Sequence, residues 1–241
     1  MSAALLNSTP PMPRTNNDER QDQIGPSPFV ILPTILEQTP EACREKIKVA
    51  ETATKWIQWD VMDGKFVSNT TWADPSVIKN WTLHAKIELD LMVEDPVGVI
   101  ARWQNVHAFR RAIWHIEADV DHAALIEEVR GQGREVGLAI SPGTSLMDLT
   151  PYLDLIDVIQ VMGVKPGFSG QALLPETNTT VAALHKMQPE LTISVDGGVN
   201  AQTLLPLAKA GATHFCMNSA FYSHAFPRDF LLGQLERLSH L

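Results

Sequence analysis

The sequence predicts an α/β protein folded as a (βα)8 barrel, and three observations lead to this fold class. The chain has 241 residues, 44% of them hydrophobic and 20% charged, so it can bury one sizeable core. Eight short runs of β-branched and apolar residues alternate with longer amphipathic stretches. Consecutive runs are centred about 22 to 33 residues apart, which leaves room for a strand, a helix and two loops in each repeat. Eight such units are what a barrel of roughly 200 to 250 residues requires.

The folded part is expected to start near residue 29. Residues 1–28 hold five prolines and the polar run NNDERQDQ, a composition that buries too little apolar surface to offset the entropy of the chain. We therefore expect a disordered tail over residues 1–28 and a single barrel domain over residues 29–241.

The eight runs give the strands in order, and the stretches between them give the helices. Thr39 followed by Pro40 predicts the start of the first helix, and Glu176 just after Pro175 predicts another start. An open doubly wound sheet is the alternative, but no GxGxxG follows the first strand, which counts against its dinucleotide-binding version. The predicted strands are residues 29–34, 56–62, 86–93, 112–116, 135–140, 157–162, 191–196 and 213–218.

Composition and charge exclude several classes of protein. A formal net charge of -9 has the wrong sign for a protein that neutralises nucleic-acid phosphates. The two cysteines, Cys43 and Cys216, stand far apart without a CxxC pattern, so neither a zinc ribbon nor a redox pair is indicated, and core packing explains both. No apolar run reaches membrane-spanning length, and no signal peptide is recognisable. We expect a cytoplasmic protein with no nucleic-acid or membrane partner.

Three predicted strands end in a carboxylate. Because side chains alternate along a strand, Gln58 and Asp60 share one face of the second strand, and Asp90 and Asp196 hold matching positions on the third and seventh. If these faces point inward, the three carboxylates meet at the C-terminal mouth, where barrel enzymes place their chemistry. The alternative is that each Asp caps the helix after its strand.

Such a cluster cannot stay fully ionised without help. Two carboxylates about 5 Å apart, at an effective dielectric constant of about 20, repel by roughly 3 kcal/mol. Either a cation lies among them or at least one carries a proton at neutral pH. Both outcomes describe a site suited to proton transfer, because acids with separated pKa values can act as base and acid.

The loops after the last three predicted strands have the composition of an anion site. PGFSGQ follows the sixth strand, Gly197 and Gly198 follow the seventh, and Asn218 and Ser219 follow the eighth. Glycines let backbone N–H groups approach a ligand closely, and barrels commonly hold a phosphate after strands seven and eight. A small phosphorylated molecule fits this pattern, while tight turns between strand and helix are the structural alternative.

Four segments resemble, in order and spacing, the signatures of the ribulose-phosphate 3-epimerase family. They are WIQWDVMDGKFVSN, LDLMVEDP, VMGVKPGFSGQ and SVDGGVN, and ILPTIL is similar to the first strand of that family. The resemblance covers residues 29–222. It implies a TIM barrel of the ribulose-phosphate-binding type and an isomerase of the pentose phosphate pathway, which moves the proton at C3 between ribulose 5-phosphate and xylulose 5-phosphate. It also implies a phosphorylated sugar as partner and a homo-oligomer.

The resemblance assigns roles to particular residues. Asp60 and Asp196 correspond to the two carboxylates that exchange the C3 proton on opposite faces of the sugar. Thr34 stands where the family has a substrate-contacting serine, and the methionines around the metal site correspond to Met62, Met92 and Met162. The phosphate-binding residues correspond to Gly167, Phe168, Ser169, Gly170, Gly197, Gly198, Asn218 and Ser219.

This sequence departs from the family at the metal site. The family binds its metal with two histidines and two aspartates, and Gln58 and Asp90 occupy the positions of the two histidines. The resulting ligand set of Gln58, Asp60, Asp90 and Asp196 offers only oxygens, which suits Mg²⁺ or Mn²⁺ better than Zn²⁺. A divalent cation is therefore the expected cofactor, with a site that holds no metal as the alternative. The departures bear on enediolate stabilisation rather than on proton abstraction.

Two departures fall in the phosphate loops, and two further residues have open roles. Ser169 and Asn218 replace glycines, and their side chains are expected to narrow the approach of an anion. His115 lies at the end of the fourth strand, where it reaches either the substrate or the carboxylate of Glu117. Lys165 precedes the phosphate loop as a source of positive charge or as a solvated surface residue.

Two other functions compete with a ketose-phosphate 3-epimerase. The first is a non-catalytic barrel that has lost its metal and binds a phosphosugar or a partner protein. The second is a phosphosugar decarboxylase or aldol-type barrel. It ranks last because ELDLMVED lacks the lysine of the DxKxxD pattern and no strand-end lysine is placed for a Schiff base.

Overall fold

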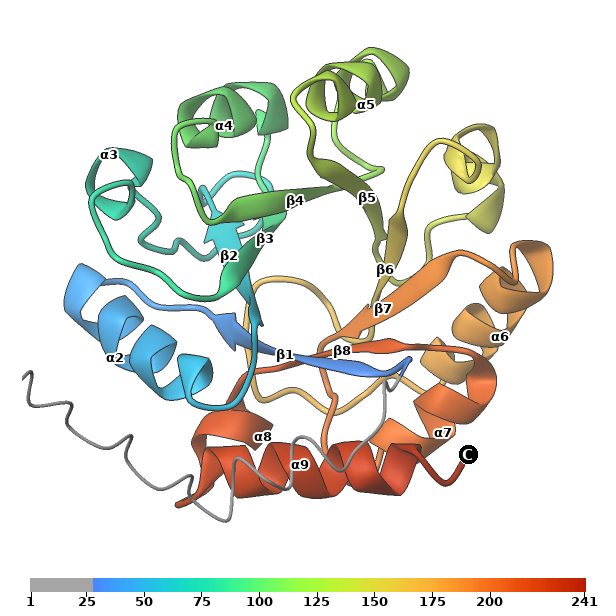
Figure 1. Ribbon diagram of the computed structural model, residues 1–241. Coiled ribbons are helices and arrows are strands. Elements are labelled where there is room, and N and C mark those ends of the chain that lie inside the picture. Colours follow the sequence, from blue (N-terminus) through green and yellow to red (C-terminus); the bar gives the residue numbers. More distant parts are fainter. Residues whose placement is uncertain (1–27) are drawn as a thin grey trace, which may run out of the picture.

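Eight parallel strands close into a barrel in the computed structural model, which describes residues 28–241 (Figure 1). The strands follow one another around the barrel in sequence order, and β1 pairs with both β2 and β8, so the open doubly wound alternative is wrong. The predicted (βα)8 barrel is confirmed. The strands are β1 (Val30–Ile35), β2 (Trp56–Met62), β3 (Lys86–Met92), β4 (Phe109–His115), β5 (Glu135–Ile140), β6 (Val158–Met162), β7 (Thr192–Asp196) and β8 (His214–Met217).

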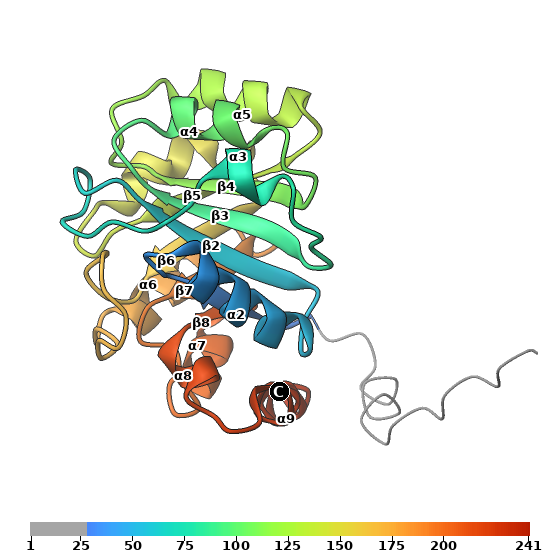
Figure 2. The ribbon, with the colours of Figure 1, turned by 90° about the vertical axis from the view of Figure 1, so that its left-hand side faces the viewer.

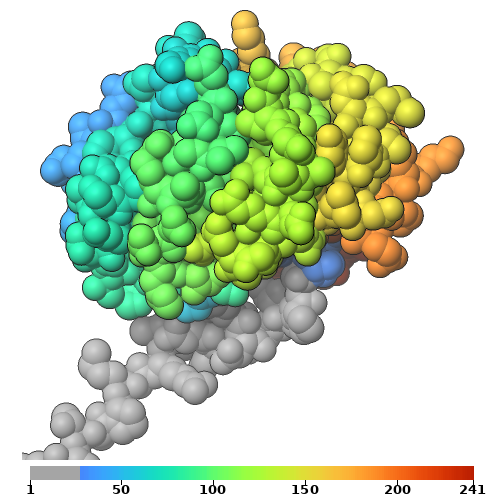
Figure 3. All heavy atoms as spheres, turned by 90° about the horizontal axis from the view of Figure 1, so that it is seen from above, coloured from blue at the N-terminus to red at the C-terminus, as the bar shows by residue number. Residues whose placement is uncertain are grey.

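The helices form a layer outside the barrel (Figures 1 and 2). In Figure 3 their side chains make a continuous surface from α3 in cyan, through α4 and α5 in green, to η1 in yellow. None of the helices in the described part of the chain has the length and hydropathy needed to cross a membrane. The helices are α2 (Pro40–Glu51), α3 (Pro75–Ile78), α4 (Pro96–Trp103), α5 (His122–Gly131), the 3₁₀ helix η1 (Leu146–Tyr152), α6 (Thr177–Met187), α7 (Leu204–Ala210), α8 (Ser219–Tyr222) and α9 (Pro227–Leu238).

One of the two predicted helix starts is confirmed and the other is displaced. Thr39 caps α2 by accepting a hydrogen bond from the Ala42 amide at 3.3 Å, and Pro40 takes the first helical position. The helix predicted to start at Glu176 is α6, which starts at Thr177. Glu176 is its N-cap residue, and Pro175 lies outside the helix. The expectation of a tail over residues 1–28 falls, apart from residue 28, outside the described residues.

The strand boundaries follow the prediction except at β4. The second and fifth strands coincide with it, whereas β4 begins at Phe109, three residues before the predicted start. Arg110 and Arg111 interrupt the apolar pattern, so the first residues of this strand were not predicted. Arg111 belongs to the strand because its guanidinium pairs with Glu88 on β3 and with Glu135 on β5, and Glu88 is fully buried. This pairing allows charged residues inside a strand.

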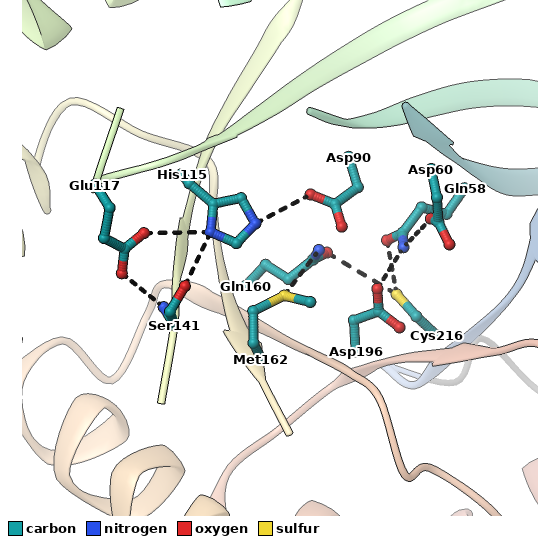
Figure 4. A network of polar contacts seen from close by, with 10 residues as sticks. All are labelled: Gln58, Asp60, Asp90, His115, Glu117, Ser141, Gln160, Met162, Asp196 and Cys216. Carbon is teal, nitrogen blue, oxygen red and sulfur yellow. Dashed lines mark hydrogen bonds and ion pairs between the residues drawn. The ribbon is translucent and has the colours of Figure 1, made fainter. Parts of the chain in front are cut away.

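Alternation along the strands separates two environments. On β2 the odd-numbered residues face the helices, and Trp59 there packs against Trp103 with ring centroids 5.6 Å apart. The even-numbered residues Gln58 and Asp60 face the interior of the barrel (Figure 4). In the register of β2 with β3, Asp60 lies opposite Asp90, so the fold itself brings two carboxylates side by side.

Candidate active site

Three carboxylates meet inside the barrel at the C-terminal ends of β2, β3 and β7. Each of Asp60, Asp90 and Asp196 offers an oxygen that lies within 4.8 Å of the corresponding oxygens of the other two. The expected convergence is confirmed. The helix-capping alternative is wrong for all three, because the N-cap positions of the helices after these strands are Asp74, Asp95 and Thr203.

Burial and mutual repulsion shift the protonation of these groups. Asp60 is 3% exposed and Asp90 is fully buried. Burial, and after it the charge of Asp196, raises the pKa of Asp60 well above its usual range, and the same causes raise the pKa of Asp90. Burial also raises the pKa of Asp196, to about 6. At least one of these acids therefore keeps a proton near neutral pH unless a cation joins the cluster.

Gln58 joins two of the carboxylates through its amide nitrogen. Its Nε2 donates to Asp60 Oδ1 and to Asp196 Oδ2, both at 2.9 Å. Its Oε1 accepts a hydrogen bond from Cys216 Sγ at 2.9 Å. Figure 4 shows the amide between Asp60, Asp196 and the thiol. The oxygen with which Gln58 would hold a metal therefore points away from the carboxylates, and ligation by Gln58 stays a prediction that requires the amide to turn over.

Asp90 lies deeper and has a different neighbour. Its Oδ1 is 3.9 Å from His115 Nε2, and no hydrogen-bond partner among the described residues reaches either carboxylate oxygen or this ring nitrogen. On the other side of the ring, Nδ1 lies 3.2 Å from Glu117 Oε2 and 3.3 Å from Ser141 Oγ. Burial acts to raise the pKa of Glu117, but hydrogen bonds, first from His115 and then from Thr144, lower it to about 2. His115 thus contacts Glu117, one of the two roles that its position suggested.

The cluster fits a divalent cation. Buried polar atoms without partners are rare in proteins, and Asp90 has two of them beside two further carboxylates. Carboxylate oxygens are the ligands that Mg²⁺ and Mn²⁺ prefer. A cation among the three oxygens would satisfy Asp90 and cancel the repulsion that raises the three pKa values.

A cavity of about 370 Å³ opens above the carboxylates. Asp60, Asp196 and Cys216 are among its lining residues, whereas Gln58 and Asp90 are not. Met62, Met92 and Met162 line it too. All of the predicted substrate and phosphate residues line this cavity: Thr34, Gly167, Phe168, Ser169, Gly170, Gly197, Gly198, Asn218 and Ser219.

The glycine turn after β7 requires its glycines. Gly197 and Gly198 have φ angles of 91° and 70°, the left-handed region that residues with a Cβ rarely adopt. A Cβ on Gly198 would come within 2.5 Å of the Leu173 backbone. The turn thus brings bare backbone to the wall of the cavity. The loop after β6 is held by Gln171, whose Nε2 donates to the carbonyls of Lys165 and Phe168, and by Asn69, which donates to the Gly167 carbonyl.

The side-chain amide of Asn218 is held by hydrogen bonds to other parts of the barrel. Its Nδ2 donates to the Thr34 carbonyl at 3.1 Å, and its Oδ1 accepts from Lys46 Nζ at 3.0 Å. These bonds tie the amide group to Thr34 and Lys46, while Asn218 itself lines the cavity. Lys165 is exposed and does not line the cavity, which agrees with a solvated surface residue.

Two residues of the site, Gln160 and Lys46, were not predicted from the sequence. Gln160 is fully buried and shares the inward face of β6 with Met162, so strand alternation alone marks it. The role of Lys46 had no such signal, because it comes from α2 and reaches Asn218 across 172 positions of the chain.

The comparisons with known proteins agree with this geometry. The model of the Ribulose-phosphate 3 epimerase family matches residues 30–222. A ribulose-phosphate 3-epimerase of Treponema pallidum is 35% identical over 202 residues, which cover 81% of this chain and 92% of the relative. One from Mycobacterium leprae is 35% identical over 210 residues, with 82% and 90% coverage, and the cytoplasmic isoform of Oryza sativa is 33% identical over 193 residues, with 78% and 84% coverage.

Solved structures with the same fold are more distant in sequence. The 3-hexulose-6-phosphate synthase of Salmonella typhimurium superposes with a TM-score of 0.63 at 14% identity, covering 87% of this chain and 98% of the other. The tryptophan synthase α-subunit of Pyrococcus furiosus reaches the same TM-score at 15% identity, with 89% and 99% coverage. These likenesses show the barrel fold alone. The match over residues 30–222 and the identity with its curated members place the chain in the ribulose-phosphate 3-epimerase family.

Proposed function

We propose that the protein is a ketose-phosphate 3-epimerase that interconverts ribulose 5-phosphate and xylulose 5-phosphate. The observation that carries this proposal is the pair Asp60 and Asp196. The two carboxylates come from β2 and β7, share one hydrogen-bonding amide and line the same phosphosugar-sized cavity. Epimerisation at C3 needs two such groups, since the proton leaves one face of the carbon and returns to the other.

The proposed reaction consists of two proton transfers at C3, one to a carboxylate and one from a carboxyl group. One carboxylate takes the C3 proton, and the C–H electron pair forms the C2=C3 bond while the carbonyl oxygen at C2 becomes an oxyanion. The other carboxyl group donates its own proton to C3 from the opposite face, and the carbonyl is restored. This exchange requires one group ionised and one protonated at the same pH. The raised pKa values of Asp60 and Asp196 support that state.

We propose Asp60, Asp90 and Asp196 as the residues that hold a divalent cation, with Mg²⁺ or Mn²⁺ favoured by their oxygens. Such a cation supplies positive charge for the enediolate oxygens. Asp90 is the residue best suited to a purely binding role, because it does not line the cavity and neither of its oxygens lies within 3.5 Å of a well-oriented donor among the described residues.

The phosphate of the sugar is proposed to lie against the loops after β6, β7 and β8. No Lys, Arg or His side chain lies among the described residues that line the cavity, so backbone N–H groups are left as the donors for an anion. The unoccluded backbone at Gly197 and Gly198 and the Ser169 and Ser219 side chains support this placement.

Replacing Gly198 by Ala tests the phosphate site. A Cβ there meets the Leu173 backbone at 2.5 Å, so the turn must shift away from its place in the cavity wall. We expect KM for ribulose 5-phosphate to rise by about tenfold, the equivalent of one hydrogen bond to a charged group. Gly131→Ala, where nothing lies within 4 Å, is the matched control and should leave KM unchanged. Equal KM values in steady-state assays of the two variants would contradict the placement.

The proposed activity is tested by following loss of deuterium from C3-labelled ribulose 5-phosphate by NMR. Purified protein is first stripped of metal and then assayed with added Mg²⁺, Mn²⁺, Fe²⁺ or Zn²⁺. We expect exchange and conversion to xylulose 5-phosphate, with Mg²⁺ or Mn²⁺ the better activators. A protein that binds the phosphosugar but exchanges no deuterium with any metal would be the non-catalytic barrel instead. Membership of the epimerase family argues against that alternative.

We also propose that the protein works in the cytoplasm. The support is the name of the Oryza sativa relative, a cytoplasmic isoform. The homo-oligomer implied by the resemblance stays a prediction.

A further inference from the structure

We propose that Cys216 and Gln58 form a positioning pair, in which the thiol of Cys216 orients the Gln58 amide so that its nitrogen holds Asp60 and Asp196 in place for proton transfer. This inference rests on the proposed epimerase function. It adds a role for two residues in setting the geometry of the acid/base pair, and it leaves the proton transfer to the two aspartates.

The first step is the direction of the hydrogen bonds. An amide oxygen only accepts and an amide nitrogen only donates, so the donor facing Oε1 decides which way the group points. Cys216 Sγ lies 2.9 Å from Gln58 Oε1. With the oxygen engaged there, both hydrogens of Nε2 face carboxylate oxygens at 2.9 Å, one on Asp60 and one on Asp196. The reverse orientation would set the amide oxygen against two carboxylates.

The second step is the state of the thiol. Cys216 is 2% exposed, and its Sγ lies 2.9 Å from the amide oxygen of Gln58, which can only accept. A hydrogen bond at this position therefore requires the S–H form of the thiol, which donates its hydrogen to Gln58. The other oxygens within reach are Ser194 Oγ at 3.4 Å and Gln160 Oε1 at 4.0 Å, both farther away than Gln58 Oε1.

The third step is the consequence for the carboxylates. Asp60 Oδ1 and Asp196 Oδ2 accept from the same amide nitrogen, so one group fixes the orientation of the two carboxylates relative to each other. Loss of the orienting thiol frees the amide to turn and loosens both carboxylates together.

Infrared spectroscopy tests the hydrogen bond without reference to activity. An S–H group that donates to a carbonyl absorbs at lower wavenumber than one that does not. The chain has two cysteines, and the Cys43→Ala variant removes the other S–H band. In that background we expect the Cys216 band to lie at low wavenumber and to move up in Gln58→Leu. A band at the same wavenumber with Gln58 and with Leu at this position would overturn the proposal.

Kinetics of Cys216 variants test the positioning role. Val is of similar size but has no donor, and we expect Cys216→Val to lower kcat by about tenfold with KM changed by less than about twofold. Cys216→Ser keeps a donor and should retain kcat within about threefold. Circular dichroism checks that both variants are folded. Wild-type kcat in Cys216→Val, or an equal loss in both variants, contradicts a role in orienting Gln58.

The results separate a failure of the positioning pair from a failure of the proposed epimerase function. Wild-type protein that catalyses no C3 exchange with any metal removes the epimerase activity, while the S–H band still reports whether Cys216 donates to Gln58. An active enzyme whose S–H band does not respond to Gln58→Leu removes the positioning pair and leaves the epimerase intact.

Discussion

Asp60→Asn and Asp196→Asn are each expected to lower kcat for epimerisation by about 10³-fold, since a positioned general acid or base contributes on the order of 10² to 10⁴. The stronger prediction concerns the half-reactions. Each variant keeps one carboxylate, which still removes a C3 proton from the face it addresses. Each should therefore exchange C3 deuterium from only one of the two sugars, ribulose 5-phosphate or xylulose 5-phosphate, and the two variants should choose opposite sugars.

The experiment compares both labelled sugars with both variants, and Asp148→Asn serves as the control. Asp148 is an exposed residue of η1, so its variant should behave as wild type. Exchange of the same sugar by both variants would mean that Asp60 and Asp196 do not act on opposite faces. Retention of rapid epimerisation by either variant would assign the acid/base role to other groups.

The stability of the metal-free protein should fall as pH rises through the acidic range. The raised pKa of Asp196 means that the folded state binds a proton more tightly than the unfolded state, whose usual value is 3.8. This contribution is fully present below pH 4 and is lost as pH rises through about 6. The raised pKa values of Asp60 and Asp90 act in the same direction. For Asp196 alone the loss is about 3 kcal/mol, or roughly 6–12 °C in Tm.

Differential scanning calorimetry of metal-stripped protein measures this effect between pH 4.5 and 8. The Asp196→Asn variant lacks one of the titrating groups. As pH rises, the Tm of the variant minus the Tm of the wild type should therefore increase. Mg²⁺ or Mn²⁺ should raise the wild-type Tm more at pH 7.5 than at pH 5, because protons compete for the same oxygens. Asp90→Asn should weaken this metal effect. A wild-type Tm that follows the Asp196→Asn profile at every pH would contradict the raised pKa.

Much of the site follows from strand alternation. The period of two places Asp60, Asp90 and Asp196 on inward faces, and the position of each at a strand end places them at one mouth of the barrel. The glycine turn after β7 was predictable for the same local reason, since φ values that need glycine are a property of a few neighbouring residues. These features depend on residues close in sequence.

The orientation of side chains depended on contacts that the sequence does not display. Gln58 has the right chemistry for a metal ligand, yet its amide turns its nitrogen to the carboxylates because Cys216, 158 positions away, takes its oxygen. Asn218 is similarly tied back by Lys46 across the join between the first and last units. The early start of β4 escaped prediction because the partners of Arg111 lie on neighbouring strands.

The sequence by itself determined that this chain forms eight strand–helix units, that three carboxylates end their strands on matching faces and that glycine-rich loops follow the last strands. Periodicity and local backbone preference carry this information along a few residues at a time. Only the tertiary structure decided that neither oxygen of Asp90 has a well-oriented hydrogen-bond donor among the described residues, and that one amide spans the two proposed acid/base groups. Those features depend on the direction of side-chain donors and acceptors that meet only after the sheet has closed.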